Sequence, residues 1–252
     1  MSSDRFVITD QMWVLMEPHC LGKKSDPGRT GGDARLFLEA VLWIARTDCP
    51  WRDLPPHFGK WNTVFKRFRD WVKADVFKRI FDALSGDPDM EYVMVDGTIV
   101  KVHRHGQGAK GGPQSQAIGK SRGGLSTKIL ALVDGLGNLV RFSVMPGQRG
   151  ETTGVKGLME EISCGAFLGD KAYDADWLRE MLTSRGIEPV IPARKGRKNP
   201  ASHDEEKYKW RHLVENYFQK LKEFKRIAMR SDKTDQSFSS MIYIAAAIIN
   251  AR

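Results

Sequence analysis

The order of apolar segments after residue 90 is the feature that most constrains how this chain can fold. A β-rich run at 91–96 continues at 97–101 as a second strand or a turn. Two further runs, at 127–134 and 139–146, suit a hairpin joined by GLGN. Helices then alternate with short apolar runs: helices are expected at 151–162, 175–185 and 207–230, and strands at 165–170 and 188–192. This order predicts an α/β domain whose mixed sheet joins an antiparallel meander to parallel crossovers.

The segment from residue 1 to 86 has helical periodicity instead. Helices are predicted at 33–46 and 61–73, and the sequence between them, CPWRDLPP, contains prolines that cannot continue a helix. The second helix is aromatic and basic, which fits a helix-turn-helix, although a packing role gives the same pattern. Its candidate DNA contacts are Lys60, Lys66 and Arg67. We therefore expect a small all-α, helix-turn-helix-like DNA-binding domain at 1–86 and an α/β domain at 87–252.

The helix expected at 207–230 has two different faces. Its polar face carries residues at i, i+3, i+7 and i+14, which fall within an arc of about 60°. These residues are Tyr208, Arg211, Glu215 and Lys222. The opposite face is apolar and runs from Trp210 to Ala228. An ordinary amphipathic surface helix has the same pattern, so the helix alone does not indicate a site.

Two aspartates upstream make a functional role for that helix more plausible, because each ends a β-rich run. Asp96 follows EYVMV and Asp170 follows GAFLG, and catalytic groups of α/β sheets tend to lie at strand ends. Together with Glu215 they could hold Mg²⁺, which prefers oxygen ligands. Two such ions about 3.5–4 Å apart can promote cleavage of a phosphodiester. Asp134 also ends an apolar run, and spacing alone does not separate it from the other two, although capping a turn is the commoner use of aspartate.

Charge favours a polyanionic partner. The chain of 252 residues has 40 Lys and Arg against 31 Asp and Glu, a net charge of +9, which suits nucleic acid but also a generically basic protein. The stretch 101–128 holds six cations and no acid. Three widely separated cysteines predict reduced thiols. The most apolar run, 241–249, is too short to cross a bilayer. A cytoplasmic, nucleoid-associated protein without a membrane partner is therefore expected.

Three motifs make the sequence similar to a known family. VDGTIVK surrounds Asp96, FLGDKAYD surrounds Asp170, and Tyr208-x2-Arg211-x3-Glu215-x6-Lys222 matches a Y-R-E-K signature at every position and spacing. They resemble the DDE transposases of bacterial insertion sequences, in the superfamily that joins insertion sequences four and five, with a closer likeness to the fifth. The resemblance covers nearly the whole chain. Arg149, Gly150 and Glu151 follow the PGQ turn, where relatives often carry His-Asp, and Ser231 stands where a tyrosine is common.

The resemblance implies a ribonuclease-H-like fold in which Asp96, Asp170 and Glu215 are catalytic and bind two Mg²⁺ ions, with Mn²⁺ as a substitute. It also implies that the polar face of the 207–230 helix contacts double-stranded DNA near the cut, and Lys128 joins that set. The implied reaction is cleavage at the terminal inverted repeats, followed by attack of the freed 3′-OH on target DNA by a homodimer or larger assembly. Two alternatives stay open: an inactive or domesticated copy that only binds DNA, and a nuclease without strand transfer.

Overall fold

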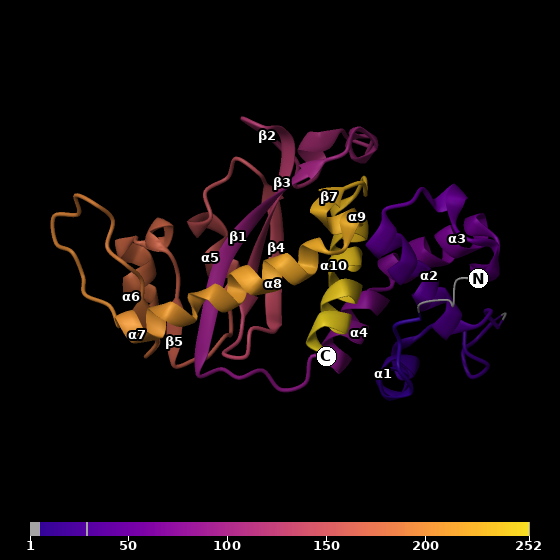
Figure 1. Ribbon diagram of the computed structural model, residues 1–252, viewed down its shortest axis with the longest axis horizontal. Coiled ribbons are helices and arrows are strands. Elements are labelled where there is room, and N and C mark those ends of the chain that lie inside the picture. The colour runs from indigo at the N-terminus through magenta and orange to yellow at the C-terminus, as the bar shows by residue number, and fades with distance from the viewer. Residues whose placement is uncertain (1–5, 29, 252) are drawn as a thin grey trace. The chain divides into compact units, whose positions relative to one another are not determined.

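The computed structural model describes residues 6–28 and 30–251, which form two compact units (Figure 1). The sheet unit comprises Asp87–Lys101 and Pro113–Lys220. The helical unit comprises the segment up to Gly86, Val102–Gly112 and the segment from Leu221 onward. The C-terminal segment therefore packs with the N-terminal helices. The division into a DNA-binding domain at 1–86 and a catalytic domain at 87–252 stays a prediction about where the two activities lie.

The sheet unit is built on a mixed sheet. Its strands are β1 (Tyr92–Val102), β2 (Gly119–Ser121), β3 (Gly124–Val133), β4 (Leu139–Pro146), β5 (Ala166–Leu168) and β6 (Glu188–Val190). They lie in the order β2-β3-β1-β5-β6, with β4 also paired to β3. β1 and β4 run antiparallel to β3, whereas β5 runs parallel to β1 and to β6. The predicted combination of a meander with parallel crossovers is confirmed, and the strand order is that of a ribonuclease-H-like fold.

β1 is one continuous strand, although the sequence allowed a second strand or a turn at 97–101. Gly97 pairs in register with Leu130 of β3, and the pairing continues to Lys101 and Ser126. The glycine therefore does not end the strand. Its lack of a side chain instead leaves room for Glu151, the residue that precedes α5 (Thr152–Leu158).

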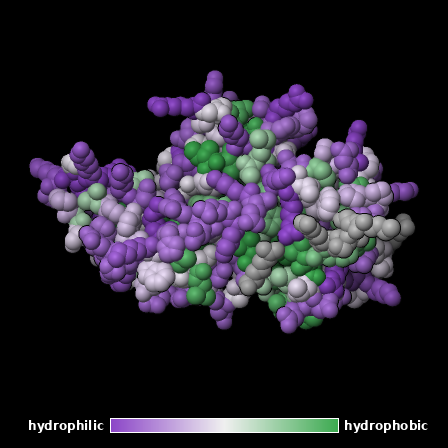
Figure 2. Space-filling model, viewed as in Figure 1, coloured by the Kyte–Doolittle hydropathy of each residue, from purple (hydrophilic) through white to green (hydrophobic). Residues whose placement is uncertain are grey.

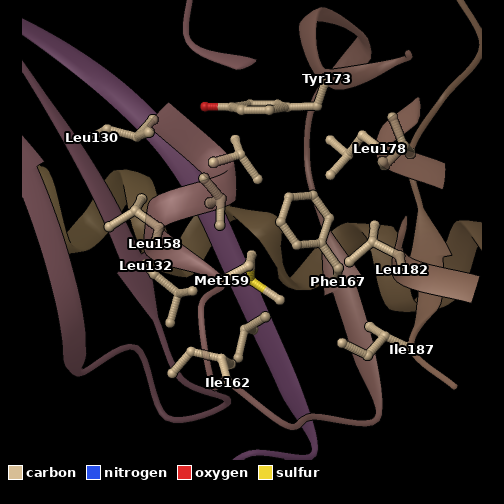
Figure 3. Close-up of a cluster of buried hydrophobic side chains, with 14 of the residues drawn as sticks. Leu130, Leu132, Leu158, Met159, Ile162, Phe167, Tyr173, Leu178, Leu182 and Ile187 are labelled. Carbon is tan, nitrogen blue, oxygen red and sulfur yellow. The ribbon is translucent and has the colours of Figure 1, made fainter. Parts of the chain in front are cut away.

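The main core of the sheet unit lies between one face of the sheet and helices α5 (Thr152–Leu158) and α6 (Asp176–Ser184) (Figure 3). β1 contributes Val93 and Val95 to this cluster. Since side chains alternate along a strand, Met94 and Asp96 face the other side of the sheet. Figure 1 shows α8 (His212–Lys222) crossing in front of the strands. One face of β1 thus packs in the core with α5 and α6, and the other face carries Met94 and Asp96.

The helix expected at 207–230 is correct in its first half and wrong in its second. α7 (Glu205–Tyr208), the 3-10 turn η7 (Lys209–Arg211) and α8 follow one another without a break. After Lys222 the chain turns, and α9 (Lys225–Ala228) and β7 (Met229–Arg230) replace the expected helix. The buried guanidinium of Arg226 donates to Asp232 and Asp48. These ion pairs require a chain direction that local helical periodicity does not reveal.

The helical unit confirms the predicted N-terminal helices. It contains α1 (Asp10–Met16), α2 (Ala34–Thr47), α3 (Trp61–Lys73), α4 (Val76–Leu84) and α10 (Asp235–Asn250), together with α9 and β7. α10 packs against α4, α2 and α3, and most of its apolar side chains are fully buried. The segment between α2 and α3, 48–60, includes two 3-10 turns and is longer than the 3–4-residue turn of a DNA-binding helix-turn-helix. The helices are therefore confirmed, and their DNA binding stays a prediction.

Candidate active site

Asp96 lies in β1, on the face of the sheet opposite the α5–α6 core. Its carboxylate accepts hydrogen bonds from the Gly97 N–H at 2.8 Å and from Arg211 Nη1 at 2.9 Å. Only 19% of its side chain is exposed. Burial raises the pKa of Asp96, the Gly97 N–H and Arg211 act against that rise, and the negative charge of Glu151 adds to it. The structure therefore holds a partly buried carboxylate beside one cationic group.

Asp170 follows β5, the strand parallel to β1. Met94 of β1 pairs with Leu168 of β5, so Asp96 and Asp170 stand two residues beyond the same register position. The Asp170 carboxylate accepts the Ala172 N–H at 2.7 Å and caps the 3-10 turn η6 (Lys171–Tyr173). Neighbouring parallel strands thus place the two aspartates at matching positions, Asp96 within β1 and Asp170 just beyond the end of β5.

Arg211 joins Asp96 to Glu215. Its Nη1 reaches Asp96, and its Nη2 donates to Glu215 Oε1 at 2.5 Å. Arg211 and Glu215 are four positions apart, a spacing that places both on one side of a helix. The Arg211 side chain is 17% exposed and that of Glu215 is 53% exposed. Two carboxylates from distant parts of the sequence therefore point oxygen atoms at the same cation.

The donor chemistry of Asp96, Asp170 and Glu215 fits a hard divalent ion. All three offer carboxylate oxygens, which Mg²⁺ prefers, and Arg211 already places a positive charge between two of them. Within 6–28 and 30–251, no three His, Cys, Asp or Glu side chains are close enough to hold one ion as they stand. Joint binding therefore requires these side chains to turn toward one another.

Glu151 is a fourth acid at this site, and the sequence reasoning missed it as a functional residue. It precedes α5 and contacts β1 from the core side, where it accepts hydrogen bonds from Lys128 Nζ and Tyr173 Oη, both at 3.1 Å. Burial and the nearby charges of Glu151, Asp96 and Asp170 raise the pKa of Tyr173. The only signal in the sequence was an acid shortly after the PGQ turn.

Asp134, which spacing alone did not separate from the other acids, is a turn residue. It is buried, and its carboxylate accepts the N–H groups of Leu136 and Asn138 at 3.0 and 2.8 Å. It also accepts the Asp89 N–H at 3.2 Å. These bonds satisfy the carboxylate within the β3–β4 hairpin, so capping accounts for this residue.

The sequence matches two known protein families. Residues 87–250 match the family described as "Transposase DDE domain", and residues 8–81 match the family described as "Putative transposase of IS4/5 family". The chain belongs to the DDE transposases. It is an insertion-sequence transposase, as its three motifs predicted.

Relatives of this transposase include proteins of other bacterial insertion sequences. A "Putative transposase for insertion sequence element IS6501" of Brucella ovis is 34% identical over 127 residues, which are 50% of this chain and 98% of the relative. "Uncharacterized protein y4sN" of Sinorhizobium fredii is 39% identical over 100 residues, 36% of this chain and 80% of the relative. Each relative therefore matches half of this transposase or less.

Solved structures similar to this transposase are complexes of other transposases. A piggyBac transposase synaptic complex with hairpin DNA aligns over 98% of this chain and 73% of that chain, with 13% identity and a TM-score of 0.48. A pre-cleavage Mos1 transpososome aligns over 90% of this chain and 81% of that chain, with 11% identity and a TM-score of 0.27. The strand order of the sheet unit carries the fold assignment.

The residues predicted to contact DNA differ in how far their side chains are exposed to solvent. Lys222, Lys60 and Lys66 are exposed, and Tyr208 is half-buried beside His203. Figure 2 shows a largely hydrophilic surface over α7 and α8. No helix in the described part of the chain is long and apolar enough to span a membrane.

Arg67 and Lys128 are engaged in internal contacts. The Arg67 guanidinium lies over the rings of Phe37 and Trp71, at 4.6 and 5.0 Å from the ring centroids. It also donates to the carbonyls of Gly32 and Leu21. Lys128 is 7% exposed, and its ammonium donates to the Arg149 carbonyl and to Glu151. These contacts favour structural roles, so the two are the weaker members of the predicted DNA-binding set.

Proposed function

We propose that this transposase cleaves double-stranded DNA at the terminal inverted repeats of its insertion sequence and joins the freed 3′-OH to target DNA. The observation that carries the proposal is the register of the parallel strands β1 and β5, which places Asp96 and Asp170 at matching positions. Arg211 joins Glu215 of α8 to Asp96. A DDE transposase is an enzyme of DNA transposition, and these are the residues through which this chain would act.

Asp96, Asp170 and Glu215 would hold two Mg²⁺ ions, with Mn²⁺ as a substitute. When bound, such ions activate the attacking oxygen and stabilise the leaving oxygen of a phosphodiester. The protein would supply the orientation. β1 and β5 fix the two aspartates. α8, which comes later in the sequence, carries Glu215, and Arg211 connects Glu215 to Asp96.

Arg211, Tyr208 and Lys222 would bind the DNA near the cut. A guanidinium matches a phosphate as well as a carboxylate, so Arg211 can exchange Asp96 and Glu215 for a backbone phosphate when the carboxylates take up metal. Lys222 lies on the same helix and is exposed. Since two element ends must be held together, a homodimer or larger assembly on DNA is expected, acting at the bacterial nucleoid.

The test is incubation of the full chain with a duplex that carries the inverted repeats flanking its gene, with Mg²⁺, Mn²⁺ or EDTA. We expect metal-dependent 3′-end cleavage and joined products. Asp96→Asn, Asp170→Asn and Glu215→Gln should each reduce cleavage more than about 100-fold. Replacing a residue that only hydrogen-bonds to a metal ligand already costs about 10- to 100-fold in activity, and replacing the ligand itself should cost at least as much. Glu223→Gln, which alters an exposed glutamate just beyond α8, is the matched control.

Each other outcome has a defined meaning. Repeat-specific binding without cleavage in either metal would contradict the proposal and favour a DNA-binding protein. Cleavage without joined products would favour a simple nuclease. Cleavage that survives in Glu215→Gln would remove Glu215 from the catalytic set.

A further inference from the structure

We propose that Glu151 is a positioning residue of the active site, which fixes Asp96 through the backbone of Gly97. The inference rests on the proposed function, because it concerns how the metal-binding carboxylates are held in place. Glu151 itself would not bind the ions. Its partners for this role are Lys128 of β3 and Tyr173 of η6.

The contact between Glu151 and Gly97 is unusually close. A Cβ atom built on Gly97 would lie 2.9 Å from Glu151 Cδ, 3.0 Å from Oε1 and 3.1 Å from Cγ. No side chain larger than hydrogen fits there unless Glu151 moves. The glycine after Asp96 therefore lets the carboxyl end of Glu151 lie against the strand. Any displacement of Glu151 acts directly on the backbone that carries Asp96.

Two partners hold the Glu151 carboxylate in that position. Lys128 Nζ lies 3.1 Å from Oε1, and its side chain is only 8% exposed. Tyr173 Oη donates to the other oxygen, Oε2, at 3.1 Å. Tyr173 is fully buried, and Figure 3 shows its ring at one end of the apolar cluster with the hydroxyl directed away from Leu178. Both oxygens of Glu151 thus have a fixed donor.

The network connects the two segments that carry the aspartates. Tyr173 stands three residues after Asp170, within the turn that Asp170 caps. Lys128 lies on β3, two residue pairs along the ladder from Gly97 and its partner Leu130. Glu151 therefore contacts the Asp96 segment directly and the Asp170 segment through Tyr173. This arrangement would fix the separation of the two aspartates.

Geometry separates this role from that of a ligand. Val95 belongs to the α5–α6 core, and alternation places residue 97 on the same face. Asp96 faces the other side, toward Arg211. The side chains of Glu151 and Asp96 therefore lie on opposite faces of β1. Glu151 can support the strand beneath the ligand, while its own oxygens are directed at Lys128 and Tyr173.

The test measures Mn²⁺ affinity of the full chain without DNA, by calorimetry or by the electron paramagnetic resonance of free Mn²⁺. Mutations of residues that support metal ligands without binding the metal typically reduce metal affinity about 10- to 100-fold. We expect a loss of about that size in Glu151→Gln, which keeps the shape but not the charge, and in Lys128→Met. The double variant should lose no more than the weaker-binding single variant, because the two residues act as one unit. Lys156→Met, at an exposed lysine of α5, is the matched control.

The outcomes distinguish three readings. If Glu151→Gln weakens Mn²⁺ binding while Lys128→Met strengthens it, Glu151 is a direct ligand and Lys128 a competing charge, which overturns the positioning role. If both variants bind like wild type while Asp96→Asn loses binding, the metal site stands and the inference is wrong. If Asp96→Asn also binds normally, the proposed metal site fails and the inference fails with it. Thermal unfolding of each variant confirms that it is folded.

Discussion

At the scale of single residues, the site depends on which face of β1 each side chain occupies. Asp96 and Gly97 are neighbours in sequence, yet one faces Arg211 and the other lies against Glu151. The motif around Asp96 predicted a functional aspartate. It could not reveal why glycine follows, because that reason is a contact with Glu151, more than fifty positions later. Lys128 was likewise read from a basic stretch, and its burial depends on the same distant glutamate.

Gly97→Ala should impair the site without disturbing the fold globally. The new methyl group would collide with Glu151, and relief of such overpacking costs about 1–3 kcal/mol. We expect weaker urea resistance and a clear loss of end cleavage. Gly157→Ala is the matched control, because a Cβ there meets nothing within 4 Å and helical alanine is preferred to glycine. Cleavage by Gly97→Ala at the wild-type rate would show that Glu151 can move without consequence.

At the scale of elements, the basic loop after β6 is tied to the Asp170 segment by Asp174. This carboxylate is fully buried and accepts Arg179 Nε and Arg197 Nη1, both at 2.8 Å, and the Arg194 N–H at 2.8 Å. Sequence periodicity located the strand and helix on either side of these residues. It could not predict the ion pairs, for the same reason that it missed the end of α8: charged side chains far apart in sequence decide the chain direction.

Asp174→Asn should destabilise the protein in a pH-dependent manner. Burial alone would raise the pKa of Asp174, but the Arg194 N–H and the guanidinium groups of Arg179 and Arg197 hold it below its ordinary value of 3.8. Its charge therefore stabilises the fold above pH 3.8, and this contribution is lost as the pH falls through the lowered pKa. Breaking a buried ion pair costs about 3 kcal/mol or more.

The measurement for Asp174 is the difference in unfolding free energy between wild type and Asp174→Asn from pH 3 to 7. We expect the full difference at pH 6 and a shrinking one below pH 4. A difference that stays constant over this range would mean that packing, and not charge, makes Asp174 important. Glu180→Gln, at an exposed position of α6, controls for the loss of an acid.

At the scale of the whole molecule, sequence order predicted the sheet and the N-terminal helices but not how the chain divides. The residues after Leu221 join the helical unit because α10 buries its apolar side chains against α4, α2 and α3. Apolar periodicity shows that such a helix has a partner, and it does not say which one. A truncation that removes residues 1–86 therefore strips α10 of its partners and is a poor test of DNA binding.

Point substitutions within α3 and just before it test the N-terminal DNA contacts without removing the partners of α10. Lys60→Ala and Lys66→Ala alter exposed lysines and should leave thermal unfolding unchanged. If these lysines contact phosphates, each substitution should weaken binding to repeat DNA and lower the salt slope by about 1. Lys156→Ala, at an exposed lysine of α5, is the control. Equal affinity and equal salt slope in all three variants would place the DNA elsewhere.

The position of Mn²⁺ in crystals of this transposase bound to a cleaved-end duplex would show directly which side chains bind the metal. Anomalous scattering locates Mn²⁺ independently of the protein atoms. We expect ions bound by Asp96, Asp170 and Glu215, with Arg211 turned from Asp96 toward a phosphate and Glu151 still between Lys128 and Tyr173. Ions held by other side chains, or Arg211 still bridging Asp96 and Glu215 with Mn²⁺ bound, would contradict it.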